Sequence, residues 1–429
     1  MTVPTGVAGL FFTVSRESRA KEHAIVLDDL SKRPVSNPIR ILLSSGEASG
    51  DLYASELLRE LRKRSPFLEA FGLGGTRSQA AGADLVVDLQ EISVIGLVEV
   101  VRKIPALKRA MSRLLEEART RKPDVAVLVD FSGFHLRLAK KLRALGVPVL
   151  YYVSPQVWAW RRGRVRRIRE LVDEMLVILP FEEELYRKEG VPVRYVGHPL
   201  VDLVEPSRTR EEFCADLGLD PSRAILFFLP GSRRREIELH VPVFRDLIEK
   251  LARQRPEIQI VMSRAPTVAP SWIEAGLQET RSRVRLLESG TYDGLKHAAV
   301  AVVASGTATV EAALCECPMV VVYRVGRLTY ALGRPFVRVP HFSMVNLIGG
   351  RRIVPELIQD GMTAEAIARE VEALLEPAAA EKMRRGLREV KAKLGGKGAS
   401  ARAAEAVLSF LEARSAIMKA QNSRQEVIP

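Results

Sequence analysis

The stretch ILLSSGEASGDLYASELLREL, from Ile41 to Leu61, joins an apolar run to an amphipathic pattern. The apolar run ends at Gly46, and a helical spacing of leucines begins near Ser49. A buried strand, a tight turn and a helix in this order open a βαβ unit. Such a turn usually holds phosphate on backbone N–H groups at the start of the helix. This turn instead carries the carboxylates of Glu47 and Asp51, which repel phosphate.

Strand-like apolar runs alternate with helical patterns along most of the chain. In the first half the runs fall near residues 39–45, 68–72, 84–87, 125–130, 148–153, 175–179 and 193–196. After a stretch rich in proline and charge, the alternation restarts with runs near 224–229, 258–262, 283–287, 300–304 and 319–323. This alternation predicts an α/β protein with two doubly wound parallel-sheet domains facing a central cleft. Ligands are expected in that cleft, outside the carboxyl ends of the strands.

The same patterns divide the chain into four segments. Residues 1–37 are predicted to be a flexible extension without chemistry, and residues 38–205 the first domain. Residues 206–390 are predicted to be the second domain, and residues 391–429 a C-terminal helix followed by a tail.

Charge and composition narrow the classes of function. The net charge of the 429-residue chain is +13, which favours nucleic acid, an anionic membrane surface or a phosphorylated substrate as partner. Three cysteines fit a reducing compartment rather than a disulfide framework. The six histidines show no metal-binding spacing, so no metal site is predicted. No apolar run approaches the roughly 20 residues of a membrane-spanning helix.

The turn after the first strand of the second half has the opposite character. AILFFLPGSRRREI, residues 224–237, is a buried strand that ends at Gly231, Ser232 and Arg233. Gly231 allows close approach of the backbone to a ligand, and the Arg233 guanidinium suits diphosphate oxygens. The alternative is a capped helix with a solvated basic first turn. Because cations at a helix N-terminus oppose the helix dipole, ligand binding explains the three consecutive arginines better.

A second phosphate-binding turn is predicted in AVAVVASGTATVEAAL, residues 299–314. The residues that join its strand to its helix are Ser305, Gly306, Thr307 and Ala308. Small residues with free N–H groups at a helix start can cradle phosphate, and Glu311 can accept hydrogen bonds from ribose hydroxyls. The alternative is a Ser/Thr N-cap with a glutamate near the third helical position. Together with the Arg233 turn on a neighbouring strand, the pattern favours a nucleotide site.

Asp130 ends another buried strand, in KPDVAVLVDFSGFH, residues 122–135. By the same rule Asp130 should face the cleft near Glu47. A partly desolvated carboxylate has a raised pKa and can accept a proton from a substrate hydroxyl. The alternative is an N-cap of the following helix. We therefore expect a hydroxyl-rich acceptor on the first domain and the nucleotide across the cleft on the second.

Nine motifs, in order through both halves, resemble the lipid-A-disaccharide synthase family. They cover about residues 38–415 and are SGEASGD (45–51), GLVEV (96–100), YYVSPQVWAWR (151–161), LPFEEELY (179–186), YVGHPLVD (195–202), LPGSRRREI (229–237), SGTATVEAAL (305–314), PMVVVYR (318–324) and NLIGGRRIVPELIQ (346–359). The resemblance implies a GT-B fold and an inverting hexosyl transfer. The donor would be UDP-2,3-diacylglucosamine and the acceptor 2,3-diacylglucosamine 1-phosphate (lipid X). The products would be a β(1→6)-linked disaccharide 1-phosphate, a precursor of lipid A, and UDP.

The resemblance also implies roles for the residues singled out above. Asp130 would be the general base on the acceptor 6-hydroxyl, and Glu47 would orient the acceptor or assist at the reacting centre. Arg233 and the helix start at 305–308 would stabilise the departing diphosphate, so neither a metal nor another cofactor is expected. Glu311 would hold the ribose. Further contacts are implied on the donor side for Asn346 and Arg351, and on the acceptor side for Ser49, Asp51 and His135.

Two departures from the family pattern affect these assignments. The family usually has D-x-P-D-F-N at the Asp130 strand, whereas this chain has DFSGFH, with Gly133 in place of the second carboxylate and His135 in place of the asparagine. The acceptor contacts are therefore expected to differ. The family's Gly-Arg-Glu is Gly-Arg-Arg here, ending at Arg352, which adds charge near the donor site.

Two basic stretches point to a surface partner. RRGRVRRIR, residues 161–169, holds six arginines in nine residues, and residues 100–122 form an amphipathic basic pattern suited to lipid headgroups. A solvated helix face over a core stripe is the alternative. Because acylated substrates must be drawn from a membrane, we expect peripheral attachment to the anionic cytoplasmic face of the inner membrane. The resemblance further implies that the C-terminal helix packs on the first domain or on a partner, which allows a homodimer.

Two other kinds of function are compatible with parts of the sequence. RNA binding would interleave stacking aromatics with the basic run, but Trp158 and Trp160 belong to an apolar strand-end motif. RNA binding also leaves Glu311 unexplained, so no nucleic acid is expected. The closer alternatives are the N-acetylglucosaminyltransferase of peptidoglycan-precursor synthesis and UDP-N-acetylglucosamine epimerases. They share the donor site, but SGEASGD and SPQVWAWR argue against them.

Overall fold

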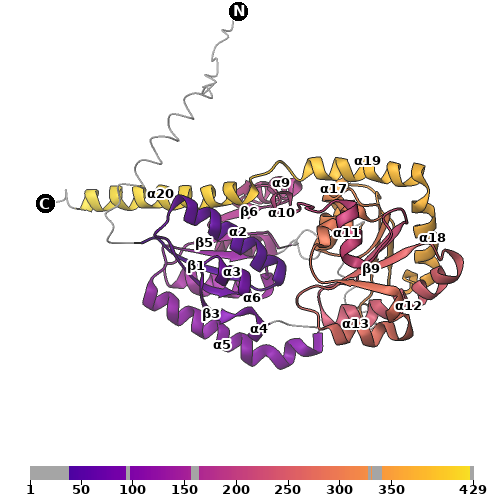
Figure 1. Cartoon of the computed structure of the whole chain (residues 1–429). Helices are drawn as coiled ribbons and strands as arrows, with labels where there is room; N and C mark the ends of the chain where they lie inside the picture. Colours follow the sequence, from indigo (N-terminus) through magenta and orange to yellow (C-terminus); the bar gives the residue numbers. More distant parts are fainter. Residues whose placement is uncertain (1–37, 93–96, 156–163, 327–329, 331–340, 426–429) are drawn as a thin grey trace, which may run out of the picture.

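The computed structural model describes residues 38–92, 97–155, 164–326, 330 and 341–425. These residues form two α/β domains side by side, the first in indigo to magenta and the second in pink to orange (Figure 1). The predicted extension at 1–37, Trp158, Trp160 and residues 161–163 of the basic run lie outside the described residues.

The first domain is built on a seven-stranded parallel sheet in the order β3-β2-β1-β4-β5-β6-β7. Its strands are β1 (Arg40–Ser45), β2 (Glu69–Gly74), β3 (Asp84–Asp88), β4 (Val125–Val129), β5 (Val149–Tyr152), β6 (Glu174–Val177) and β7 (Val193–Tyr195). Its helices are α2 (Ala48–Arg64), α3 (Thr76–Ala80), α4 (Leu89–Ile92), α5 (Leu97–Arg121), α6 (Ser132–Ala144), α8 (Arg164–Leu171) and α9 (Pro180–Lys188). The central strand β4 is buried along its whole length, because helices cover both faces of the sheet.

The second domain repeats this architecture with six parallel strands in the order β10-β9-β8-β11-β12-β13. The strands are β8 (Ile225–Leu229), β9 (Gln259–Ser263), β10 (Val284–Leu287), β11 (Val300–Ala304), β12 (Met319–Tyr323) and β13 (Glu356–Ile358). The helices are α10 (Leu200–Leu203), α11 (Arg210–Leu217), α12 (Arg234–Gln254), α13 (Pro270–Leu277), α14 (Thr291–His297), α15 (Thr307–Leu314), α17 (Met344–Gly349), α18 (Ala364–Leu375) and α19 (Pro377–Lys393), with 3₁₀ turns η1 (Gln278–Arg283) and η3 (Gln359–Gly361).

All twelve predicted strands are confirmed, and the two doubly wound sheets with them. The edge strand β13 was not predicted. It has three partly buried residues and lacks the apolar run by which a buried strand is recognised.

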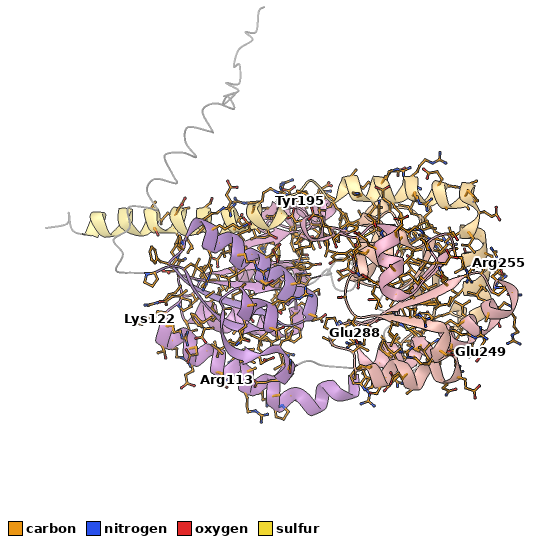
Figure 2. The ribbon with its side chains drawn as sticks, viewed as in Figure 1. Arg113, Lys122, Tyr195, Glu249, Arg255 and Glu288 are labelled. Atoms are coloured by element: carbon orange, nitrogen blue, oxygen red, sulfur yellow. The ribbon has the colours of Figure 1, made fainter. Side chains whose placement is uncertain are left out.

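The chain crosses between the domains twice, and the two crossings are bonded to each other. His198 N–H donates to the Leu394 carbonyl at 3.2 Å, and Arg402 Nε donates to the Val196 carbonyl at 2.9 Å. Tyr195, labelled in Figure 2 beside this junction, donates its hydroxyl to the Lys393 carbonyl. The final helix α20 (Ala399–Gln425) then runs back along the first domain and packs against α2 (Figure 1).

Within the described part of the chain, every helix is too short or too polar to span a bilayer.

A candidate active site between the two domains

The topology of both sheets directs the predicted site residues to the cleft. In a doubly wound sheet, a crevice opens where the strand order reverses, at the carboxyl ends of the two central strands. In the first sheet this point lies between β1 and β4, which are followed by Glu47 and Asp130. In the second sheet it lies between β8 and β11, which are followed by Arg233 and Ser305. The predicted residues therefore flank both crevices.

A single ion pair joins the two turns across the cleft. Arg233 Nη2 donates to Glu47 Oε2 at 2.7 Å, between residues 186 positions apart in the sequence. Both side chains are partly exposed, 45% for Arg233 and 42% for Glu47, so the pair is accessible from the cleft. Because solvent screens such a pair, we expect it to contribute little stability and to exchange partners readily when an anion enters.

Asp130 lies beside this pair in an unusual backbone conformation. Its φ is +53° and that of Phe131 is +50°, both in the left-handed region, which costs roughly 1–2 kcal/mol for each residue other than glycine. Burial and the nearby Glu47 carboxylate raise the pKa of Asp130 to about 7, although a backbone hydrogen bond from Phe131 and the Arg233 charge oppose the shift. A carboxyl group with this pKa can take up and release a proton near neutral pH.

The turn beside Asp130 explains Gly46. A side chain added at Gly46 would overlap the Phe131 ring, with a Cβ contact of 2.1 Å. The glycine therefore lets the two turns of the first domain pack against each other, and this contact brings Glu47 next to Asp130.

In the second domain, Glu236 shapes the basic turn. Its Oε2 accepts hydrogen bonds from the backbone N–H groups of Ser232 at 2.9 Å and Arg233 at 3.2 Å. Gly231 has a φ of +121°, and a Cβ there would collide with the Glu236 side chain. Ser232 is exposed at the carboxyl edge of the sheet, and the partly exposed Arg233 guanidinium lies between the carboxylates of Glu236 and Glu47.

Glu311 lies on α15 and faces a cluster that spans both domains. Its Oε1 accepts a long hydrogen bond from Tyr292 Oη at 3.4 Å, and burial raises its pKa. The Tyr292 hydrogen bond and the positive charge of Arg77 on α3 oppose that shift. Burial, followed by the Glu311 carboxylate, raises the pKa of Tyr53 on α2. Gly306, just before α15, is exposed, and Ser305 Oγ donates to the Phe342 carbonyl at 3.1 Å.

Two residues predicted on the acceptor side are engaged within the protein. Asp51 is 4% exposed, and its oxygens accept hydrogen bonds from Gly75 N, Arg77 N, Ser78 N and Ser78 Oγ. It therefore fastens α2 to the start of α3. His135 is fully buried, with both ring nitrogens bonded to protein atoms. Both side chains therefore have structural bonds, and their contact with an acceptor stays a prediction, as does that of Ser49, which is partly exposed beside Glu47.

Two residues predicted on the donor side also have other partners. Asn346 is fully buried, its amide nitrogen bonded to Val354 and Glu356 and its oxygen accepting from the N–H groups of Ile353 and Val354. It holds the loop between α17 and β13. Arg351 pairs with Glu389 of α19 at 2.5 Å, on an exposed surface. Donor-side contacts of these two side chains stay a prediction.

Sequence reasoning missed two residues beside the ion pair. The phenol of Tyr323, at the end of β12, has its pKa raised by burial and by the nearby Glu236 and Glu47 carboxylates. His240 is fully buried, with Nδ1 2.8 Å from the Pro230 carbonyl and Nε2 accepting from Arg324 N–H at 3.0 Å. It therefore ties the end of β8 to the end of β12. Tyr323 lies in the motif PMVVVYR but was not singled out, and the partners of His240 are separated from it in sequence.

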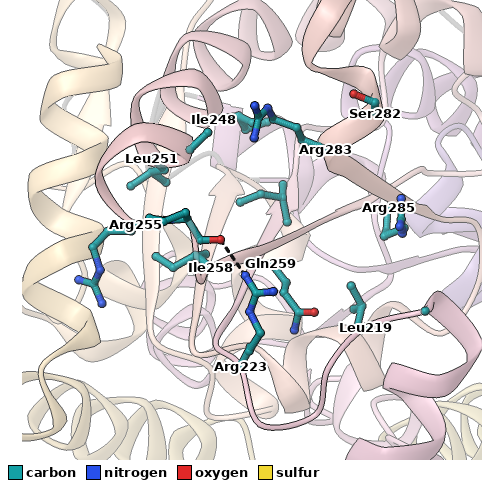
Figure 3. A pocket seen from close by; sticks show the side chains of 14 residues that line it. Leu219, Arg223, Ile248, Leu251, Arg255, Ile258, Gln259, Ser282, Arg283 and Arg285 are labelled. Atoms are coloured by element: carbon teal, nitrogen blue, oxygen red, sulfur yellow. Dashed lines mark hydrogen bonds between the residues drawn. The ribbon is translucent and has the colours of Figure 1, made fainter.

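A hollow lined by arginines lies elsewhere on the second domain (Figure 3). It is bounded by the starts of β9 and β10 and is therefore at the sheet edge opposite the cleft. Arg223 donates to the carbonyls of Pro256 and Glu257, and Arg255 pairs with the Glu257 carboxylate. These arginines brace the surrounding loops, and we do not assign the hollow to the active site.

Comparison with solved structures identifies the class. The UDP-GlcNAc 2-epimerase from Neisseria meningitidis bound to UDP-GlcNAc superposes with a TM-score of 0.61 at 14% identity, covering 86% of this chain and 100% of that one. The calicheamicin glycosyltransferase CalG4 gives 0.57 at 16% identity, covering 88% and 99%. These likenesses show the predicted GT-B fold. In this fold the acidic and basic turns face each other at the two crevices.

Sequence comparison identifies the family. Residues 41–410 match the lipid-A-disaccharide synthetase family. The lipid-A-disaccharide synthase of Myxococcus xanthus (strain DK1622) is 48% identical over 378 residues, 88% of this chain and 99% of the relative. That of Solibacter usitatus (strain Ellin6076) is 44% identical over 375 residues, 87% and 98%. The chain belongs to the lipid-A-disaccharide synthetase family, and the alternative functions considered from sequence are not favoured.

Proposed function

We propose that this protein is a lipid-A-disaccharide synthase that uses Asp130 as its general base and Arg233 as its main leaving-group contact. It transfers 2,3-diacylglucosamine from UDP-2,3-diacylglucosamine to the 6-hydroxyl of 2,3-diacylglucosamine 1-phosphate, with inversion. The observation that carries the assignment of roles is the meeting of an acidic and a basic turn, at 2.7 Å, where the crevices of the two domains face each other.

The acceptor hydroxyl is activated on the first domain. Asp130 takes the proton of the 6-hydroxyl while the oxygen attacks the anomeric carbon of the donor. The raised pKa of Asp130 strengthens it as a base, and near neutral pH a large fraction of it is ionised. Ser49 contacts the acceptor in this scheme, which its partial exposure next to Glu47 supports.

The departing diphosphate is stabilised on the second domain. As the bond between the anomeric carbon and the phosphate oxygen breaks, charge develops on the UDP. Arg233 and the N–H groups at the start of α15 supply the compensating donors, and Glu311 accepts from the ribose hydroxyls. The proposal assigns no step to a metal ion, so full turnover in excess EDTA is expected and loss of turnover that added Mg²⁺ restores would contradict it.

Glu47 and Arg233 change partners during the reaction in this scheme. In the structure they neutralise each other. A donor diphosphate, carrying more charge than one carboxylate, displaces Glu47 from Arg233 by the stronger charge-assisted hydrogen bonds of a bidentate contact. Glu47 is then available to orient the acceptor beside Asp130.

A transfer assay tests this proposal. Radiolabelled acceptor 1-phosphate and the UDP-diacyl donor are incubated in detergent micelles with wild type, Asp130→Ala and the control Glu249→Ala. Glu249 is exposed on α12, at the far end of the second domain (Figure 2). We expect disaccharide from wild type and the control, and a loss of about 100-fold or more in Asp130→Ala. Disaccharide from Asp130→Ala at the wild-type rate would move the base elsewhere, and none from folded, UDP-binding wild type would indicate another UDP-sugar reaction.

We also propose peripheral attachment to the anionic inner face of the membrane. One end of helix α5 supports this attachment. Ile104 is 42% exposed there, beside the exposed Lys108 and Arg109. Further along the helix, the apolar residues Ala110, Leu114 and Ala118 are buried against the sheet. An exposed apolar residue among cations suits a headgroup layer. We expect sedimentation with anionic vesicles at low salt and about tenfold weaker binding for Lys108→Glu/Arg109→Glu. Equal binding to neutral vesicles would contradict it.

The oligomeric state is a separate proposal. Helix α20 packs on α2 of its own chain, which supports a complete fold within one protomer. The homodimer that the resemblance allows is tested by light scattering across a concentration series.

A further inference from the structure

The backbone carbonyl of Asp130 accepts hydrogen bonds from two side chains on different elements. His135 Nδ1, on α6, lies 2.7 Å from this oxygen, and Tyr151 Oη, on β5, lies 2.5 Å from it. Both side chains are fully buried. Because a carbonyl only accepts, the imidazole proton must be on Nδ1. Nε2 is then an acceptor, and Ser44 Oγ on β1 donates to it at 2.8 Å.

The Asp130 turn needs such support. Asp130 and Phe131 are consecutive residues with positive φ, and neither is glycine. This conformation persists only where the surroundings hold it. Its effect is to turn the chain from β4 into α6 and to leave the Asp130 carboxylate beside Glu47 in the cleft. Without the two donors, an extended or helical φ at Asp130 would direct the carboxylate elsewhere.

The surroundings of His135 keep it neutral. Its ring is flanked by Phe131, Phe134 and Tyr151, with centroids 5.6, 5.8 and 6.2 Å away. Burial lowers its pKa to about 4, so the ring carries one proton at neutral pH. One tautomer and one orientation satisfy both nitrogens, which makes His135 a rigid link from β1 to the Asp130 turn.

We propose that His135, assisted by Tyr151, is a positioning residue that aims the Asp130 carboxylate at the acceptor hydroxyl. It reaches the substrates only through Asp130. This inference rests on the proposed function, in which Asp130 is the general base.

The experiment compares three variants with wild type in the transfer assay, after each is shown to be folded by circular dichroism. His135→Leu fills the site but has no donor. His135→Asn keeps an N–H at the position of Nδ1, two bonds from Cβ. Leu138→Ala, fully buried on the same helix, is the control for general loosening of α6. For each variant kcat, both KM values and the Kd for UDP are measured well below its melting temperature.

We expect His135→Leu to lower kcat by roughly 10–100-fold, the cost of a misaimed reacting group. Its KM for donor and Kd for UDP should stay within about twofold of wild type, because the nucleotide site is on the other domain. His135→Asn should recover most of the lost kcat, and Leu138→Ala should match wild type. Equal kcat losses in His135→Leu and Leu138→Ala, or no loss in His135→Leu, would overturn the proposal.

Tyr151→Phe provides an independent test if His135→Leu does not fold. It removes one hydroxyl and keeps the ring, and we expect kcat to fall by about 3–10-fold with unchanged UDP affinity. Unchanged kcat would overturn the proposal. Asp130→Ala separates the two levels: an active Asp130→Ala refutes the proposed base, whereas an inactive Asp130→Ala with fully active His135 and Tyr151 variants refutes only the positioning.

Discussion

The two domains share one topology but present opposite charges at equivalent positions. Glu47 follows β1 and is the N-cap residue of α2, and Arg233 follows β8 and is the N-cap residue of α12. A carboxylate at this position is favoured by the helix dipole, whereas a guanidinium is disfavoured. In the second domain Glu236 and, across the cleft, Glu47 offset that cost. The fold therefore fixes where a ligand binds. One residue in each turn, Glu47 or Arg233, selects the charge of the ligand group that binds there.

The turns that follow the neighbouring central strands, β4 and β11, also differ between the two domains. After β4 the chain passes through two left-handed residues and places Asp130 in the cleft. After β11 it passes through Gly306 into the exposed start of α15, where backbone N–H groups can meet an anion. The first crevice thus suits proton removal from an alcohol, and the second suits a phosphate leaving group.

The largest effect should come from exchanging the charges of the two turns. In Glu47→Arg/Arg233→Glu the ion pair can form again, so folding is expected to survive. The diphosphate would then meet a carboxylate, and we expect kcat/KM to fall by about 1000-fold or more. The measurement is the transfer assay beside a UDP-binding titration. Substantial activity in the exchanged variant would mean that the pair acts only to hold the domains together.

Removing the structural carboxylate of each turn, Asp51 or Glu236, should lower the free energy of unfolding by different amounts. Asp51 is buried and accepts four hydrogen bonds, whereas Glu236 caps two backbone N–H groups in a more open turn. Each buried donor left without a partner costs about 1–3 kcal/mol. We expect Asp51→Ala to lose roughly 3 kcal/mol in urea unfolding and Glu236→Ala about 1 kcal/mol. Asp51→Asn, which keeps an acceptor oxygen, should lie between wild type and Asp51→Ala, and a ranking reversed from this would contradict the structural role.

Asp130 should weaken the first domain at high pH. Its folded pKa of about 7 lies above the ordinary value of 3.8, so the folded state binds the proton more tightly than the unfolded state. The ionised carboxylate therefore costs stability above pH 7, and the cost disappears below pH 4. At about 1.4 kcal/mol per pKa unit the upper bound is about 4 kcal/mol, and we expect roughly 1–3 kcal/mol after solvent screening. Asp130→Asn should be more stable than wild type by this amount at pH 8 and no more stable at pH 4.

The smallest effect should be a shift in the pH profile. Because the base must be ionised, kcat/KM should fall about tenfold per pH unit below an apparent pKa of about 7. Glu47 raises the pKa of Asp130 and Arg233 lowers it, so Glu47→Gln should move the acidic limb down and Arg233→Gln should move it up. If both variants shift the acidic fall of kcat/KM in the same direction, that fall reflects the ionisation of a group other than Asp130.

The sequence predicted the repeated architecture well, because buried parallel strands are continuous apolar runs that need no knowledge of their neighbours. The run at β4 is such a case, with five buried residues in five. It failed at β13, which is short and only half-buried at the sheet edge. The motif resemblance and the sequence comparisons agree on the family. The family could therefore be assigned without the structure.

The site was predictable only in part. Glu47, Asp130 and Arg233 lie one to four residues beyond the ends of central strands, and the rule for parallel sheets places such residues at the crevice. Asp51, His135 and Asn346 are also polar residues predicted to contact a substrate, yet their side chains are buried and bonded within the protein. Sequence position alone does not tell a residue that contacts a ligand from one that holds the loop beside it.

By itself the sequence determined the α/β class, the strands, the two crevices and the opposite charges of their turns, since these depend on local apolar periodicity and on the residues that end each strand. Only the tertiary structure decided which polar atoms are already bonded, that Glu47 and Arg233 meet across the cleft, and that His135 and Tyr151 hold the Asp130 carbonyl. The physical reason is that a hydrogen bond requires two groups at about 3 Å, and these partners are brought that close only by packing between separate elements.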